Sequence, residues 1–465
     1  MDELRPDHNE DERLDADASE APIDADVIDR LAAYGHEVEE VAEVERSPHS
    51  QEFAVESEGS GPGSDATDHN VGSDPAGLAP ALNEVAAAES PRTPRFGRTR
   101  SRQPGAAKPR KDKRAKKLVG LKIGASQLAA AQVVNNGAPE LVEVFREPLE
   151  PGLVVSGEIR DPETLGDALK RFFELHKLPK TGVRLGISNN RIGVRIFEIE
   201  GVSDPVQLEN AIRFRAEEVL PIPLDQAVLD YVILDEQVRE DGTEWKRILL
   251  VVAYREVVDR YLQACRRAGL QVVGIDLEAF ALLRSLEAPA EREPSSGALV
   301  AVAVGHDRTT IAVSTGRNCE FARVVAWGGW SLNVAIAREL DRAPSEVESI
   351  KRQLSFAHAT EIDGLTDEQV AKTKDGIQRA LATFARELVA SLQFYQAQPG
   401  ALGIGDIVLT GGTAHMDGLP EALRELVGVP IRLGDPFRRV KVGPRVSSDG
   451  QPGSVAVAIG LGIED

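Results

Sequence analysis

Three stretches of the chain are apolar up to a turn of small residues. The first, 118–133, is interrupted only at Gly124-Ala125-Ser126 and predicts two strands joined by a tight turn. The stretch 299–313 has the same form, and 406–419 is a strand that leads into Gly411-Gly412. Such turns expose backbone N–H groups in a concavity that suits phosphate, although a plain hairpin turn has the same pattern. Three of them in this order favour a nucleotide held between two related halves.

The residues around these stretches predict an α/β domain that is built twice. Apolar alternation indicates strands, and a 3.6-residue period with capping residues such as Asp161-Pro162 indicates helices. In the first half we expect strands at 118–123, 128–134, 140–147, 183–187 and 271–275, and helices at 161–178, 256–268 and 277–286. The strand-turn-strand pattern begins again at Leu299 and is followed by helices at 332–340, 345–357 and 375–396. This repetition is an internal repeat.

A different small unit lies inside the first half. It is predicted as a strand at 192–199, a helix from Ser203-Asp204-Pro205 to Pro221, and strands at 228–234 and 247–253. The order strand, helix, strand, strand indicates an inserted module. We therefore divide the chain into a tail at 1–117, a first lobe at 118–189 and 255–297, an inserted subdomain at 190–254 and a second lobe at 298–465.

Charge separates the tail from the rest. Residues 1–90 carry 25 Asp and Glu against 4 Arg, whereas residues 91–117 carry 12 Lys and Arg against Asp112. Apolar residues in this tail are too dispersed to form a core, so we expect it to be disordered, acidic first and then basic. The remainder is mildly acidic, and nothing in it resembles a nucleic-acid-binding surface.

Two interpretations of the basic run 92–117 stay open. It is either a solvated linker or a segment attracted to an anionic membrane surface.

The chain has only Cys265 and Cys319, no zinc-ligand spacing, no signal peptide and no apolar run near the roughly 20 residues that span a bilayer. We expect a protein made and kept in the cytoplasm.

Five blocks resemble the PilM family of type IV pilus assembly proteins, which have the actin/Hsp70-like two-lobed ATPase fold and are related to FtsA. They are Val119–Ser126, Arg213–Leu224 followed by Asp230-Tyr231, Gly274–Ala281, Arg386–Tyr395 and Leu409–Thr413. The resemblance covers about 118 to 463, and Pro221-Ile-Pro-Leu224 with Asp230-Tyr231 is its most specific part. The inserted module then corresponds to an SHS2-type subdomain.

The resemblance implies a cytoplasmic adaptor that binds ATP between its lobes and docks the N-terminal peptide of a PilN-like inner-membrane protein. Through that partner it would connect to pilus assembly motor or platform proteins. The sequence leaves open whether such a pilus serves motility, adhesion or DNA uptake and competence.

The same resemblance implies the positions of the nucleotide contacts. The first phosphate loop is Gly124, Ala125, Ser126 and Gln127, and the second runs from Gly305 to Thr310 with Thr309 and Thr310 at its end. Residues expected to border the nucleoside are Gly411, Gly412, Thr413 and Met416. Glu348 and Lys351 match a pair that contacts adenosine in relatives, and an exposed ion pair within one helix is the alternative.

Two positions depart from the pattern of the fold. Lys122 and Ala303 stand where active members carry carboxylates that position Mg²⁺, a cation that prefers oxygen ligands. Lysine instead places a positive charge near the phosphates. Asp307 is the one nearby acid in the second turn and a candidate to recover some metal binding. We therefore expect ATP binding with weak or no hydrolysis, an uncertain role for Mg²⁺, or a purely structural adaptor that has lost nucleotide binding.

No other catalytic constellation stands out. The eight histidines show no metal-ligand spacing, and neither a nucleophile elbow nor a Walker loop is present, so we name no catalytic residue and no metal ligand. His306 and His415 beside the glycine turns are interpreted as loop residues. The alternatives are a small-molecule kinase of the same superfamily, which would need a general base, and an FtsA-like filament-forming division protein.

Overall fold

The computed structural model describes residues 116–464 except 220–222, 240–241, 288–296, 317 and 447–450. The predictions for 1–115, including disorder and all but the last two residues of the basic run, lie outside the described residues. Lys116 and Lys117, which we had placed in the tail, instead begin the first strand. Among the described residues, every helix is too short or too polar to cross a bilayer.

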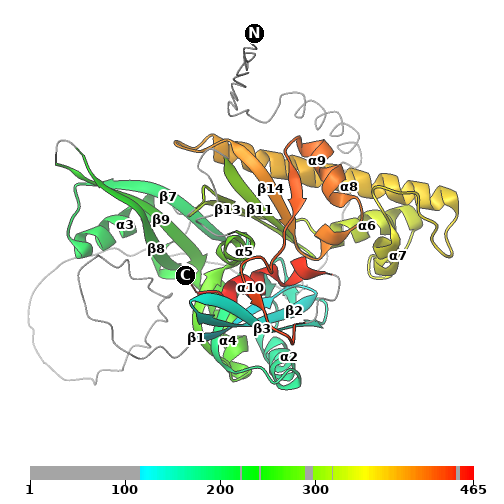
Figure 1. Cartoon of the computed structure of the whole chain (residues 1–465), viewed down its shortest axis with the longest axis horizontal. Coiled ribbons are helices and arrows are strands. Elements are labelled where there is room, and N and C mark those ends of the chain that lie inside the picture. The colour runs from blue at the N-terminus through cyan, green and yellow to red at the C-terminus, as the bar shows by residue number, and fades with distance from the viewer. Residues whose placement is uncertain are drawn as a thin grey trace, which may run out of the picture. The chain divides into compact units, whose positions relative to one another are not determined.

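A six-stranded sheet forms the first lobe, in the order β10-β6-β1-β2-β3-β16. Figure 1 shows β1, β2 and β3 of this sheet side by side. Its strands β1, β2 and β3 form an antiparallel meander, whereas β6 and β10 run parallel to β1. Their bounds are β1 Lys116–Ile123, β2 Gln127–Asn136, β3 Ala138–Pro148, β6 Thr181–Ile187, β10 Gln271–Leu277 and β16 Lys441–Val442. The predicted meander is confirmed.

The second sheet repeats this topology in the order β13-β12-β11-β14-β15. Again three antiparallel strands are followed by two strands that run parallel to the central one. The bounds are β11 Ala298–Val304, β12 Thr309–Ser314, β13 Cys319–Val325, β14 Ile404–Thr410 and β15 Ile431–Leu433. The internal repeat is therefore a repeat of sheet topology, although we did not predict β13 or β15.

Strands at the centre of each sheet are apolar throughout because both of their faces are covered. In β11, Ala298, Val300, Val302 and Val304 belong to the core formed with the second lobe's helices, whereas Leu299, Ala301 and Ala303 belong to the core shared with the first lobe. This alternation makes Ala303 face the other lobe.

Side-chain caps explain where several helices begin. Helix α2, Pro162–Leu175, starts where the Asp161 side chain accepts hydrogen bonds from the Glu163 and Thr164 amides. The long helix α8, Asp367–Gln396, begins at Asp367 rather than at 375 because Thr366 and Gln369 form a capping box. The helix we expected at 345–357 is only α7, Glu348–Gln353, since the Ser355 hydroxyl accepts the Ala357 and His358 amides and turns the chain away. The remaining helices are α4 Arg255–Arg267, α5 Glu278–Leu286, α6 Gly329–Leu340, α9 Leu419–Val427 and α10 Ala456–Gly462.

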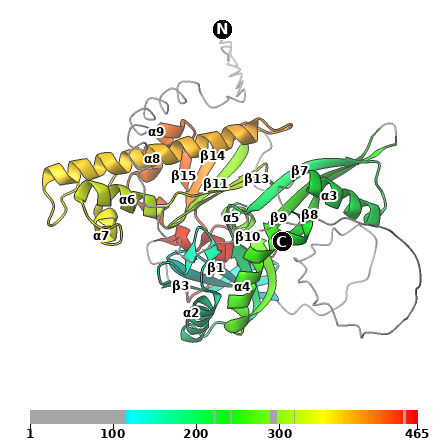
Figure 2. The same cartoon turned by 180° about the vertical axis from the view of Figure 1, so that it is seen from behind.

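The inserted module has the predicted order of elements, and Figure 2 shows its strands and α3 together. It consists of β7 Ile192–Glu200, α3 Pro205–Val219, β8 Ala227–Val238 and β9 Glu244–Tyr254. Its sheet has the order β7-β9-β8, and a separate small core forms around Ile199, Leu208, Ile212 and Ile248.

Helix α5 lies between the two sheets, and helix α10 packs beside it on the first. Helix α5 contacts β6 and β10 of the first sheet and β11, β12 and β13 of the second. Helix α10 packs on β1, β2 and α5, so closely that a Cβ on Gly120 would lie 2.0 Å from the Ala458 carbonyl oxygen. Residues 441–442 and 456–462, which we counted with the second lobe, thus contribute to the layer of the first sheet.

Candidate functional site

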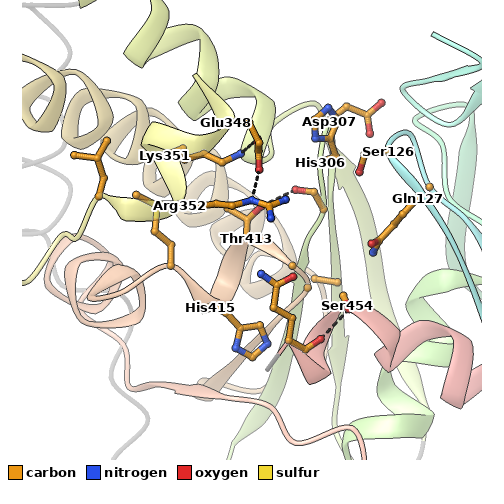
Figure 3. A pocket seen from close by; sticks show the side chains of 18 of the residues that line it. Ser126, Gln127, His306, Asp307, Glu348, Lys351, Arg352, Thr413, His415 and Ser454 are labelled. Carbon is orange, nitrogen blue, oxygen red and sulfur yellow. Dashed lines mark hydrogen bonds and ion pairs between the residues drawn. The ribbon is translucent and has the colours of Figure 1, made fainter. Parts of the chain in front are cut away.

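The three glycine turns meet at one cavity of about 600 Å³. It is lined by every residue that we predicted for the site except Thr309 (Figure 3). These lining residues are Lys122, Gly124, Ala125, Ser126, Gln127, Gly305, Thr310, Glu348, Lys351, Gly411, Gly412, Thr413 and Met416. Segments up to about 290 residues apart in the sequence therefore converge, as expected for a site between two lobes.

Thr309 does not reach this cavity. Successive strand residues point to opposite faces, and Thr309 and Thr310 are the first two residues of β12. The fully buried Thr309 hydroxyl donates a 2.8 Å hydrogen bond to the Trp327 carbonyl, whereas the Thr310 hydroxyl lies 2.9 Å from that of Ser188 in the first lobe. Thr309 holds the chain just beyond β13 rather than facing the cavity.

The first two turns each contain the same type of backbone hydrogen bond. The Gly124 N–H donates to the Gln127 carbonyl at 3.0 Å, and the Gly305 N–H donates to the Arg308 carbonyl at 3.0 Å. Lys122 and Ala303 each stand two residues before the glycine, so the equivalence inferred from sequence holds in three dimensions.

The third turn depends on glycine for close approach. Gly411 has φ +95°, and a Cβ there would lie 2.2 Å from the Val304 carbonyl oxygen. A Cβ on Gly412 would meet nothing within 4 Å, so this residue leaves open space at the cavity wall. The Thr413 hydroxyl donates to the Gly305 carbonyl at 2.9 Å, which ties the third turn to the second.

A cluster of charged side chains forms part of the cavity wall between the two sheets. The Glu278 carboxylate, at the first residue of α5, lies 3.4 Å from the Lys122 ammonium and 3.7 Å from the Arg308 guanidinium. The side chains of Glu278 and Arg308 are only 3 % and 6 % exposed. Sequence reasoning placed Arg308 in the second loop without a role for its side chain, and it missed Glu278, for which an acid directly after a strand was the available signal.

Asp307, our candidate for recovered metal binding, is already engaged. One carboxylate oxygen lies 3.2 Å from the Arg308 guanidinium, and the other accepts a 2.6 Å hydrogen bond from the Ser156 amide. Ser156 has φ +50° at the turn between the short strands β4, Val154–Val155, and β5, Glu158–Ile159. The second-lobe turn is thereby bonded to a first-lobe hairpin.

The predicted pair on α7 is present and faces the cavity. Glu348 and Lys351 are 2.7 Å apart, and Arg352 and Asn333 also donate to Glu348 (Figure 3). Burial would raise the pKa of Glu348, but hydrogen bonds led by that from Lys351 outweigh it and lower this pKa to about 2. Because the Lys351 side chain is only 11 % exposed, the pair is not simply a solvated ion pair on a helix surface.

Both histidines near the turns are half-buried residues of the cavity wall that also contact the surrounding protein. His306 lies against Trp330, with 5.5 Å between ring centroids, and burial followed by the charge of Lys351 lowers its pKa. The His415 Nε2 accepts the Gly453 amide at 3.1 Å. Within the part of the chain that the structure describes, no three His, Cys, Asp or Glu side chains are grouped as metal ligands.

Comparison with known proteins accounts for this architecture. Residues 120–465 match the family described as type IV pilus assembly protein PilM. The chain belongs to the PilM family. A solved PilM-PilN type IV pilus biogenesis complex contains a chain that is 28 % identical with a TM-score of 0.64, and the match covers 74 % of this chain and 97 % of that one. The two-lobed actin-like ATPase fold predicted from sequence is confirmed.

FtsA proteins are also similar to this chain in sequence. The cell division protein FtsA of Pseudomonas aeruginosa is 28 % identical over 357 residues, covering 69 % of this chain and 84 % of FtsA. FtsA of Bacillus subtilis is 23 % identical over 353 residues, covering 68 % of this chain and 78 % of that protein. These matches fit the predicted relation between PilM proteins and FtsA.

Proposed function

We propose that this PilM-family chain is a cytoplasmic adaptor of type IV pilus assembly that holds ATP between its lobes and hydrolyses it weakly or not at all. The observation that carries the proposal is the convergence of three glycine turns from both lobes on one cavity. Its volume of about 600 Å³ lies within the range of small-molecule sites.

The residues present fit a nucleotide. Lys122, Arg308 and Lys351 line the cavity and would attract a polyphosphate, and Gly412 leaves room for a ligand to approach the backbone. On this proposal Gly124 to Gln127 and Gly305 to Thr310 hold the phosphates. Met416, Thr413 and the α7 pair border the nucleoside.

The residues fit Mg²⁺ poorly. A cation stands at position 122 and a methyl group at 303, while Asp307 and Glu278 both face Arg308 within 3.7 Å. Magnesium prefers near-octahedral oxygen ligands. The phosphate oxygens of ATP fill only part of this coordination sphere, and carboxylates or waters must complete it. This arrangement supports weak or absent turnover.

The similarity to a solved PilM-PilN type IV pilus biogenesis complex supports a partner of the PilN kind. We propose that this chain docks the cytoplasmic N-terminal peptide of a PilN-like single-pass inner-membrane protein and through it contacts the assembly motor or platform. It would then lie at the inner membrane through partners, with the basic run 92–117 as a secondary contact to anionic lipid.

Calorimetric titration of the full chain tests this role, with ATP and with the N-terminal peptide of the PilN-like protein, separately and together. We expect saturable binding of each. Phosphate release should not rise above that of a Lys122→Met variant, because the wild-type site already lacks the usual acids. Steady hydrolysis above that background would refute the adaptor without turnover, and absence of ATP binding would leave a structural adaptor.

A further inference from the structure

The charged cluster at the cavity wall is neutral before any ligand arrives. Lys122 and Arg308 contribute two positive charges, and Glu278 and Asp307 contribute two negative charges. Arg308 belongs to the second lobe, yet it reaches Glu278 and the Ile123 carbonyl of the first, at 3.7 Å and 3.5 Å. The cluster therefore ties the two lobes together at the place where phosphates would bind.

Two atoms of this cluster are buried without a hydrogen-bond partner. They are Glu278 Oε1 and Arg308 Nε, and both residues line the cavity. A buried polar group without a partner is costly, so an arriving ligand gains from supplying one. Arg308 Nε is a donor, which suits a phosphate oxygen. Glu278 Oε1 is an acceptor next to the same cations that a phosphate would use.

We infer that Glu278 is a built-in counter-ion of the phosphate site, that Lys122 and Arg308 supply the positive charge usually provided by magnesium, and that the site therefore favours metal-free nucleotide. This inference rests on the proposed function, since it concerns how the same cavity takes ATP. Glu278 forms ion pairs with Lys122 and Arg308. An incoming polyphosphate competes with it for them.

The sign of the metal effect follows from this charge arrangement. A dication bound to ATP would be brought close to Lys122 and Arg308. Both residues would repel it, because like charges repel strongly where water is excluded. The cavity would offer this cation a methyl group at Ala303 and the carboxylates of Glu278 and Asp307, which are already paired with cations. Free ATP carries more negative charge than its magnesium complex and meets the same two cations without that repulsion.

The test is calorimetric titration of the full chain with ATP, once in excess Mg²⁺ and once in excess chelator. We expect ATP to bind in chelator at least as tightly as in Mg²⁺. Binding that is tenfold or more weaker in chelator would overturn this inference while leaving the proposed nucleotide binding intact. Absence of binding in both conditions would overturn nucleotide binding itself.

Variants separate a counter-ion from a structural group. Glu278→Gln keeps the side-chain shape but removes the competing charge, and should tighten ATP binding in chelator by roughly tenfold. Lys122→Met should weaken it by a similar factor. Glu256→Gln is the matched control, because Glu256 lies in the first turn of α4 in the same lobe, is exposed, and should change nothing. Unchanged or weaker binding by a Glu278→Gln protein with a wild-type melting temperature would contradict the role.

Discussion

The first two glycine turns share a backbone conformation but differ in chemistry. Each has a glycine amide bonded to the carbonyl three residues later, at 3.0 Å in both. The first turn carries the small or neutral residues Ala125, Ser126 and Gln127. The second carries His306, Asp307 and Arg308, two of which contact the opposite lobe.

This difference shows what a duplicated topology preserves. Backbone geometry is set by the strand pair on either side of each turn, and it is retained in both halves. Side chains that project from the turn are not fixed by that geometry, and of these two turns only the second carries charged side chains that reach the opposite lobe. In the first lobe, Glu278 pairs with Arg308 and the Ser156 amide donates to Asp307, and neither residue belongs to the first turn.

The largest expected effect is a difference in stability between variants of Arg308 and Gln127, which occupy equivalent positions in the two turns. Arg308→Met leaves Glu278 and Asp307 without their shared buried cation, so we expect a loss of about 3–5 kcal/mol in the free energy of unfolding. Gln127→Met should cost less than about 0.5 kcal/mol. Urea denaturation of both variants checks this, and equal losses would show that the turns are energetically alike.

A smaller effect should distinguish Asp307 from Ser126. Asp307→Ala removes a charge-assisted hydrogen bond to the Ser156 amide and an ion pair with Arg308, for an expected loss of about 1.5–3 kcal/mol. Ser126→Ala should lie within about 0.5 kcal/mol of wild type. Hydrogen exchange offers a second measurement, because only the Asp307 variant should lose protection at the Ser156 amide.

The glycines themselves should differ modestly. A Cβ on Gly305 would lie 2.8 Å from the Arg308 carbonyl oxygen, and the Gly305 carbonyl is itself held by Gly329 and Thr413. A Cβ on Gly124 would lie 3.0 Å from the Gln127 oxygen. We expect Gly305→Ala to cost about 1–2 kcal/mol and Gly124→Ala less than about 1 kcal/mol, measured by thermal unfolding. The reverse order would mean that the first turn is the more tightly packed.

The smallest effect concerns pH and the second lobe's α7. The pKa of Glu348 is lowered to about 2 from its ordinary 4.5, so its stabilising contribution is complete above pH 4.5 and is lost as pH falls towards 2. Because the Glu348 side chain is 39 % exposed, solvent reduces this contribution. Between pH 5 and 3 the wild type should lose only about 1 kcal/mol more than Glu348→Gln. The exposed Glu346→Gln should follow the wild type.

Much of the fold was predictable because local pattern and tertiary environment agree. Strands such as β1 and β2 are apolar because both sheet faces are covered, and α2 begins at an Asp-Pro cap that is visible in the sequence. Helix α7 was predicted too long because the Ser355 hydroxyl that ends it acts through backbone bonds which residue spacing does not show. The short strand β16 was missed because it exists only through pairing with β3.

The candidate site divides in the same way. Sequence alone determined the three glycine turns, their order and the presence of Lys122 and Ala303 two residues before the first two of them, because glycine requirements and residue identities are local properties. Only the tertiary structure decided that Thr309 points away, that Glu278 lies between Lys122 and Arg308, and that Asp307 bonds to Ser156. Those outcomes depend on which side chains from distant elements meet in a buried space, where each charge requires a partner that the linear order of residues does not specify.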